Sequence, residues 1–300
     1  ILSSTPTIRL SDVVAVGEAT IVYDREGNEI DQYVSTNSNR LSVGMDEIPD
    51  YLGKAFVAIE DERFYQHNGI DFKSIIRAGY QFFKTGGEEA QGASTITQQL
   101  LKNTVFTDWT SEGNNKIKKI KRKIQEQYLA LEITKYYSKD EILLRYMNAI
   151  NLGQNTLGVE SASLRYFGKH CSELTISECA VIASITQNPS KYNPIRHPEE
   201  NVKRREKCLN KMLELGFISQ TQYDEAMADT DAVYERIGLY DIDYQEANAT
   251  TGSYFSDAVY EQVKQDLILS GYNENMAETL LTSGGLRVES TLDPKIQAIL

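Results

Sequence analysis

The chain has 300 residues, 41% of them apolar and 25% charged, which fits a globular protein and excludes a disordered one. Its formal net charge of −12 at pH 7 argues against nucleic acid as the main partner, because duplex binding needs a basic face. Three cysteines without a CxxC spacing indicate neither a disulfide framework nor a metal site.

The two ends of the sequence predict a fragment of a longer protein. The chain opens on ILSSTPTIRL, without an initiator methionine, and closes on DPKIQAIL, which has the pattern of the first turns of a helix. It contains no run of 18 apolar residues, so the pattern predicts no membrane-spanning segment.

Three regions follow from the patterning. Residues 1–39 contain two alternating runs around Glu26-Gly27-Asn28, which predicts a β-hairpin followed by a linker. Residues 40–230 carry helical periodicity, repeated capping boxes and short loops, which predicts one mostly α unit. Residues 231–300 are more polar and predict a connector with a helix from about residue 254 and a strand in GGLRVESTLD.

The stretch AIEDERFYQHNGID, residues 58–71, ends an apolar helical run in Glu60, Asp61 and Glu62. An acidic cluster at this position is commonly a solvated last turn. Acidic groups at a helix C-terminus nevertheless oppose the macrodipole, so their placement lacks a stability rationale. A carboxylate at the rim of a core suits a general base, which makes Glu60 the candidate, with His67 close enough to orient it.

The stretch GASTITQQLLKN, residues 92–103, predicts a helix that begins at Ser94 or Thr95. The free N–H groups of a helix start suit phosphate oxygens, and Gln99 and Lys102 share one face. The alternative is a capped amphipathic helix with its polar residues in solvent.

A long helix is predicted from about Asn115, and six of the eight residues 116–123 are basic, including Arg122 and Lys123. One face carries an apolar stripe of Ile117, Ile120, Ile124, Tyr128 and Leu131. The opposite face carries Lys119, Arg122 and Glu126 and continues as Leu129, Ala130 and Ile133, a second buried seam. Basic groups beside a buried seam indicate a cleft that attracts an anion such as a diphosphate.

Together, two separated carboxylates, a helix start suited to phosphate and a cationic helix face fit inverting transfer of a sugar from a diphosphate leaving group. One carboxylate would take the proton of the acceptor hydroxyl, and cations would hold the leaving group.

Five ordered blocks carry a family resemblance: EDERFYQHNG, GASTITQQLLKN, RKIQE, KDEILLRYMNAINLG and LGVESASLRYFGK. QNPSKYNP and HPEENVKRREKCLNKMLELGFI follow them. In these blocks the sequence resembles the peptidoglycan glycosyltransferase domain of class A penicillin-binding proteins, shared with monofunctional wall transglycosylases. The resemblance covers residues 40–230, and GGLRVESTLD is similar to the segment that leads into a transpeptidase domain.

The resemblance implies a mainly α, lysozyme-like, two-lobed domain with short flanking β segments. It implies that Glu60 is the general base. It also implies that Glu126 is a second catalytic residue, which lies across the cleft near the donor diphosphate and assists its departure or helps to position a divalent ion. It further implies that Asp61 holds local structure, and that His67 is structural. The implied substrate-binding residues are Asp61, Thr95, Gln99, Lys102, Asn103, Arg122 and Lys123.

The implied substrate is the lipid-linked disaccharide-peptide diphosphate, lipid II, which is polymerised into β-1,4 glycan strands. The implied partners are lipid II and the growing glycan chain, the bacterial membrane surface and a transpeptidase domain in the same full-length chain. No cofactor is certain, although the diphosphate could bring a divalent cation, Mg²⁺ or Mn²⁺. The implied location is the extracytoplasmic face of the cell membrane, with an anchor outside this fragment.

Two features depart from the family pattern or stay open. TDWTSEGNNKIKK inserts residues between the second and third blocks and lengthens the approach to Arg122 and Glu126. Tyr80, Phe82 and Phe83 fit either a membrane-facing surface or a buried core. The SxxK motif of a transpeptidase is absent from SITQ at 184–187, so penicillin binding is not predicted for this fragment.

Two other functions compete with this interpretation. A lytic enzyme that cleaves glycan with one acidic residue would need no diphosphate clamp, so Lys102 and Arg122 would have no role. A non-catalytic module that binds anionic lipid through KIKKIKRK would leave Glu60 and Gln99 unexplained.

Overall fold

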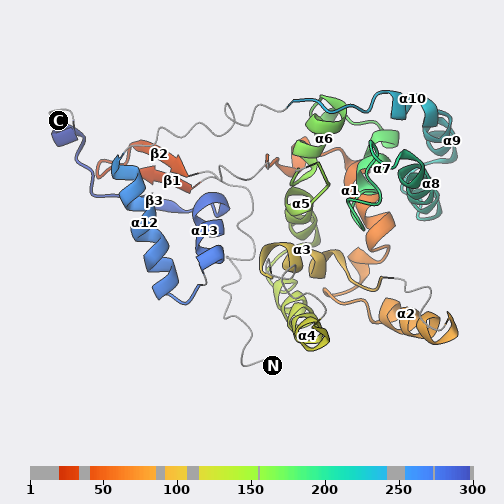
Figure 1. Cartoon of the computed structure of the whole chain (residues 1–300), viewed down its shortest axis with the longest axis horizontal. Coiled ribbons are helices and arrows are strands. Elements are labelled where there is room, and N and C mark those ends of the chain that lie inside the picture. The colour runs from red at the N-terminus through yellow and green to blue at the C-terminus, as the bar shows by residue number, and fades with distance from the viewer. Residues whose placement is uncertain are drawn as a thin grey trace. The chain divides into compact units, whose positions relative to one another are not determined.

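The computed structural model describes residues 20–33, 41–85, 92–106, 115–154, 156–241, 254–272 and 274–297. The chain divides into two compact units, each described by itself below (Figure 1). The first contains Val43–Asp241, and the second combines Pro6–Ser42 with Ile242–Leu300.

Apart from an isolated β-bridge between Asn151 and Leu157, the regular secondary structure in the described residues of the first unit is helical, which confirms the mainly α class. Its elements are η2 (Met45–Glu47), α1 (Asp50–Glu60), η3 (Phe64–Gln66), α2 (Phe72–Thr85), α3 (Ile96–Thr104), α4 (Lys116–Ile133), α5 (Lys139–Ala149), α6 (Val159–Phe167), η5 (Cys171–Glu173), α7 (Ile176–Ala183), α8 (Pro198–Glu214), α9 (Gln220–Ala228) and α10 (Thr230–Glu235).

The helix starts that the sequence predicted are capped as expected. Thr95 and Ser138 accept a hydrogen bond from the backbone N–H three residues later and form full capping boxes, as do Thr175 and Ser219. Asn115 caps α4 through the N–H groups of Ile117 and Lys118. These local bonds fix where each helix begins without help from tertiary contacts.

The core of the first unit lies around α1. Helix α1 packs against α7 and α8, while α3 packs against α4 and α5. Phe56 of α1 and Tyr146 of α5 are fully buried and meet edge to face, with ring centroids 5.7 Å apart. Burial of the apolar face of α1 therefore holds its last residue, Glu60, in a fixed place.

Helix α4 buries a different face from its longest apolar stripe. Within the first unit, Ile117 and Ile120 are 80% and 59% exposed, and Ile124, Tyr128 and Leu131 are also exposed. The buried positions are Gln125, Glu126, Leu129, Ala130 and Ile133. The expectation that both faces are buried is therefore wrong for the first stripe: α4 packs against α3, and the face that it buries is the one that carries Glu126.

The second unit contains a three-stranded sheet of order β2-β1-β3, made of β1 (Thr20–Tyr23), β2 (Glu29–Tyr33) and β3 (Arg287–Glu289). Strand β1 pairs antiparallel with β2 and parallel with β3. Its core joins Val22, Tyr33 and Leu281, and α12 (Tyr254–Leu269), α13 (Glu274–Ser283) and α14 (Pro294–Gln297) complete it. The predicted hairpin and the predicted tail segments are thus parts of one unit (Figure 1).

Three sequence features lie largely or wholly outside the described residues. They are the glycine-rich segment after Thr85, the insertion around Trp109 and the side chain of Phe82.

Candidate active site

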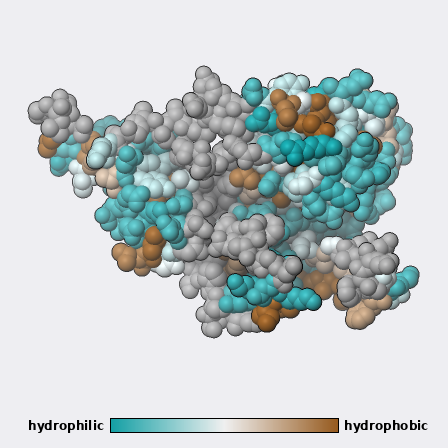
Figure 2. All heavy atoms as spheres, viewed as in Figure 1, coloured by the Kyte–Doolittle hydropathy of each residue, from teal (hydrophilic) through white to brown (hydrophobic). Residues whose placement is uncertain are grey.

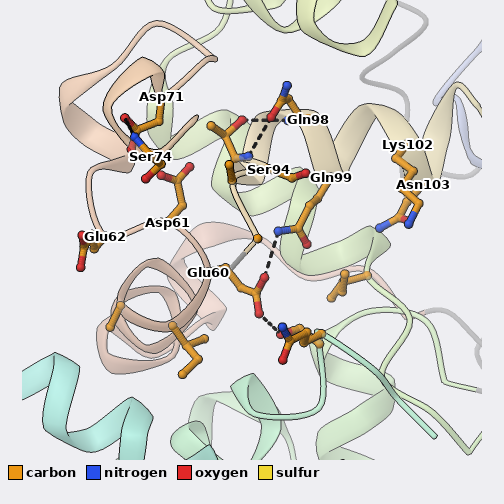
Figure 3. A pocket seen from close by; sticks show the side chains of 18 of the residues that line it. Glu60, Asp61, Glu62, Asp71, Ser74, Ser94, Gln98, Gln99, Lys102 and Asn103 are labelled. Carbon is orange, nitrogen blue, oxygen red and sulfur yellow. Dashed lines mark hydrogen bonds between the residues drawn. The ribbon is translucent and has the colours of Figure 1, made fainter. Parts of the chain in front are cut away.

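A cleft of about 720 Å³ opens in the first unit beside the last turn of α1 (Figure 3). The end of α1, the helices α2, α3, α4 and α8, and the segment that follows α7 contribute to its lining. The described lining contains four acidic residues, Glu60, Asp61, Glu62 and Asp71. It contains seven basic ones: Arg77, Lys102, Arg122, Lys123, Arg204, Lys207 and Lys211. An acidic protein thus has an excess of cations in its cleft, which suits an anionic ligand.

Glu60 is placed by the end of α1. The helix stops at Glu60 because Asp61 leaves the helical conformation, with φ −156° and ψ 69°. The Glu60 side chain is 10% exposed, and its Oε2 accepts a hydrogen bond from Gln99 Nε2 at 3.0 Å. Its Oε1 lies 2.6 Å from both Thr186 Oγ1 and Arg204 Nη2.

Gln99 is oriented by a buried tyrosine. The hydroxyl of Tyr146 donates to Gln99 Oε1 at 3.3 Å, so the amide nitrogen of Gln99 points at Glu60 (Figure 3). Burial, followed by the nearby charge of Glu60, raises the pKa of Tyr146 well above its usual value. Tyr146 therefore remains a neutral donor and fixes which end of the amide faces the carboxylate.

Arg204 and Thr186 are site residues that the sequence analysis missed. Arg204 is 9% exposed, donates to Ser184 O at 3.1 Å and to Gln187 Oε1 at 2.9 Å, and its guanidinium lies 5.0 Å from the ring centroid of Tyr192. One signal was available: Arg204, Lys207 and Lys211 share one face of α8 at spacings of three and four. All three line the cleft.

The carboxylate of Asp61 closes the start of α3. It is buried, its Oδ1 lies 2.9 Å from His67 Nε2, and its Oδ2 accepts from the Ile96 N–H at 3.0 Å. The Gln98 N–H is bonded to the Thr95 hydroxyl, which itself donates to Gly69 O at 2.7 Å. The helix start is thus largely satisfied by protein groups, which corrects the expectation that its free N–H groups await a phosphate.

The residues predicted to bind substrate all line the cleft, and Lys102 and Asn103 lie on the opposite side of Glu60 from Asp61 (Figure 3). Lys102 and Asn103 from α3 lie together on this side of the cleft (Figure 3), and Arg122 and Lys123 from α4 complete its lining. Thr95 and Gln99 also line the cleft, although their polar groups already bond to Gly69, Glu60 and Tyr146.

Glu126 lies behind these cations. It is fully buried and is not among the residues that line the cleft. Its Oε1 accepts from Arg122, and its Oε2 accepts from Lys123 Nζ at 2.8 Å. Lys123 also donates to Ser94 Oγ at 2.9 Å. Glu126 is therefore placed to hold Arg122 and Lys123 at the cleft wall.

On the other side of the cleft, Glu62 forms a charged cluster with Arg77 and Lys211. Glu62 Oε1 accepts from Arg77 Nη1 at 3.0 Å, and its Oε2 lies 3.5 Å from Lys211 Nζ. The hydrogen bond from Arg77 lowers the pKa of Glu62, and Lys211 adds to this effect against partial burial. Glu62 thus stays ionised and offsets part of the positive charge on this side.

The carboxylates of the site do not fit a resident divalent cation. Glu60 bonds Arg204, Asp61 bonds His67 and Ile96, and Glu126 bonds two cations. In the described part of the chain, no group of three or more His, Cys, Asp or Glu residues could hold a metal ion.

Comparison with known proteins places these features in a family. The family model "Transglycosylase" matches residues 26–213. The chain is 38% identical over 306 residues to Penicillin-binding protein 1A of Clostridium perfringens, covering 99% of this chain and 35% of that protein. It is 37% identical over 276 residues to Penicillin-binding protein 1F of Bacillus subtilis, covering 92% of this chain and 35% of that protein. The chain thus spans about a third of the length of these relatives.

Among solved structures, Penicillin-Binding Protein 1A from Haemophilus influenzae matches with a TM-score of 0.36 and 22% sequence identity, covering 94% of this chain and 28% of that chain. The family model covers more than half of the 300 residues and includes all five sequence blocks. The resemblance drawn from those blocks is confirmed, and the chain belongs to the transglycosylase family of the penicillin-binding proteins.

Proposed function

We propose that this chain is a peptidoglycan glycosyltransferase that polymerises lipid II into β-1,4 glycan strands with inversion. The observation that carries the proposal is Glu60, a fixed carboxylate that borders a cleft lined with seven cations. A base and a diphosphate clamp in one cleft are the two elements that this transfer needs.

In this mechanism Glu60 removes the proton from the 4-hydroxyl of the acceptor sugar. Each carboxylate oxygen can accept two hydrogen bonds. Oε1 already accepts two, from Thr186 and Arg204, whereas within the described residues Oε2 accepts one, from Gln99. We therefore assign the proton to Oε2. The acceptor oxygen then attacks the anomeric carbon of the donor from the side opposite its diphosphate, which leaves with the bonding electron pair.

The leaving diphosphate is held by Lys102, Arg122 and Lys123. These side chains come from two helices, α3 and α4, and line the same cleft. The guanidinium of Arg122 suits two phosphate oxygens at once, and Glu126 behind it limits its motion. Glu126 is therefore a positioning residue in this proposal, in place of the catalytic role that the resemblance implied.

The membrane surface that supplies lipid II would contact α2 and α4. On α2, Tyr80 and Phe83 are 67% and 86% exposed, so the alternative of a buried core is wrong for these two. Figure 2 shows hydrophobic residues on the surface of both helices, beside charged ones. Apolar side chains among lysines are typical of interfacial helices. In the described residues no helix is long and apolar enough to cross a membrane.

The longer relatives support two further parts of the proposal. Their extra length leads us to propose that the full-length protein carries a transpeptidase domain and a membrane anchor. We further propose that the glycosyltransferase domain works at the outer face of the cell membrane. The lytic alternative is less favoured, because it gives no role to Lys102 and Arg122, which line the cleft. The lipid-binding alternative is less favoured, because it leaves Glu60 and its bond to Gln99 unexplained.

The test is polymerisation of fluorescent lipid II in detergent by the wild type, Glu60→Gln and the matched control Glu225→Gln. Glu225 is exposed on α9 and does not line the cleft. We expect glycan ladders from the wild type and from Glu225→Gln, and none from a folded Glu60→Gln. Ladders from Glu60→Gln would overturn its assignment as the base, and glycan cleavage without ladders would favour the lytic alternative.

A further inference from the structure

A second cavity of about 340 Å³ lies on the other flank of α1 and shares no lining residue with the catalytic cleft in the described part of the chain. Ile48, Gly53, Val57, Leu143 and Met147 form a buried apolar lining, contributed mainly by α1 and α5. Met45 and Tyr65 stand at the mouth and are 38% and 55% exposed, so the cavity opens to solvent.

The lining is both apolar and adaptable. Gly53 presents no side chain to the cavity, and a Cβ atom there would lie 3.3 Å from Leu143 Cδ2. Met45 and Met147 contribute unbranched thioether side chains that can repack around an inserted group. These features suit a flat ring or another large apolar group better than a polar ligand.

The mouth of the cavity is acidic. Asp50 and Asp140 are exposed there, whereas Lys54 is the one basic residue among the lining residues that the structure describes. Lys54 Nζ lies 2.5 Å from Asp50, and the Tyr65 hydroxyl donates to Asp140 Oδ1 at 3.1 Å. Each carboxylate has two oxygens, so both can accept a further hydrogen bond. A cation on an incoming ligand would meet complementary charge.

We propose that this cavity docks a partner polypeptide that inserts one aromatic side chain flanked by a lysine or arginine. Its volume is at the low end for small-molecule sites, about 300–1,000 Å³, which suits one large side chain whose main chain remains outside. An aromatic anchor in a pocket with charged residues at the rim is the usual arrangement of an interface hot spot. The acidic rim selects a basic neighbour over an acidic one. Docking here requires neither the catalytic cleft nor its activity.

The probes are two blocked dipeptides, acetyl-Trp-Lys-amide and acetyl-Trp-Glu-amide, titrated into protein labelled with ¹³C at the methionine methyl groups. The chain has only five methionines, so the spectrum is simple. Met45 and Met147 line the cavity, whereas Met212 and Met227 do not and serve as internal controls. We expect the Trp-Lys probe to shift the first two signals with a Kd on the order of 1 mM and leave the controls unchanged.

The charge requirement is tested separately. We expect the Trp-Glu probe to bind about threefold or more weakly than the Trp-Lys probe, which is the range for an exposed ion pair. The double variant Asp50→Asn with Asp140→Asn should remove this difference between the two probes. Asp46→Asn, an exposed change in the same region outside the lining, should preserve it. An unchanged Met212 signal reports that each variant is folded.

Three results would overturn the proposal. They are equal binding of both dipeptides to the wild type, shifts that spread to Met212 and Met227, and the absence of any shift at Met45 and Met147. Tighter binding of tryptamine than of the Trp-Lys probe would also overturn it, because the cavity would then belong to a small amphipathic amine.

Discussion

Glu60 Oε1 accepts from Arg204 Nη2 at 2.6 Å, although Arg204 lies 144 residues later in the chain. Helix α1 ends at Glu60 and helix α8 carries Arg204, and these two helices pack directly against each other. Both side chains are about nine-tenths buried, so neither charge is well solvated without the other. The candidate base is therefore held by the core of the first unit.

Removal of Arg204 should destabilise the protein more than a surface change would. We expect Arg204→Gln to lower the free energy of unfolding by about 3 kcal/mol, because it leaves the Glu60 carboxylate buried and unpaired. Arg204→Lys should lower the free energy of unfolding by less, since it keeps the positive charge. Urea denaturation measures both, with the exposed Arg196→Gln as control, expected within about 0.5 kcal/mol of the wild type.

A double variant tests whether Glu60 and Arg204 interact directly. The double variant Glu60→Gln with Arg204→Gln should lose clearly less stability than the sum of the single variants, because it removes both charges together. Strictly additive losses would contradict a direct interaction between Glu60 and Arg204.

Glu126 should act on substrate binding through the cations that it holds. Glu126→Gln leaves Arg122 and Lys123 without the buried carboxylate that fixes them, so we expect KM for lipid II to rise about tenfold, with a smaller fall in kcat. Steady-state polymerisation kinetics measure the split. Glu132→Gln, on the same helix but outside the cleft, is the matched control. A kcat at background level with unchanged KM would instead favour direct participation of Glu126 in the chemistry.

Gly69 should tolerate no side chain. Its φ is +88°, and a Cβ atom would lie 2.2 Å from the backbone oxygen of Ala130 in α4. We expect Gly69→Ala to lower the free energy of unfolding by more than about 3 kcal/mol, because strain and overlap add. Gly216, with φ +70° and no atom within 4 Å of the added Cβ, separates the two effects: Gly216→Ala should cost only about 1 kcal/mol. Equal losses in a thermal or urea melt would show that the overlap at Gly69 is relieved.

The pair of His170 and Glu160 should make stability depend on pH. His170 Nδ1 lies 2.6 Å from Oε1 of the buried Glu160, and this hydrogen bond raises the pKa of His170 above its usual 6.5. The folded state thus binds the proton more tightly, so the stabilisation is complete below pH 6.5 and is lost as pH rises through the raised pKa.

The corresponding measurement is Tm against pH for the wild type and His170→Gln. We expect the Tm of the wild type to fall relative to that of His170→Gln as pH rises above about 6.5. Below pH 6.5 the difference in Tm between the two proteins should stay constant. Parallel curves across the whole range would contradict the role of His170.

The sequence by itself determined the helices, their caps and the family. Thr95, Asn115, Ser138, Thr175 and Ser219 cap their helices through bonds to residues two or three positions away, and such local bonds depend little on the rest of the fold. Glu60 was found for a similar reason, because the end of an apolar run and the acidic residues after it are adjacent in the chain.

Tertiary structure alone decided which polar groups meet. The partners of Glu60 at Gln99, Thr186 and Arg204 come from three other parts of the chain, and periodicity gives no measure of the distance between them. The same holds for α4, whose pattern predicted two buried faces, whereas the structure buries only the face that carries Glu126. Hydrophobic patterning fixes what an isolated helix can bury, whereas the neighbours that it meets determine which face is buried and which charges must pair.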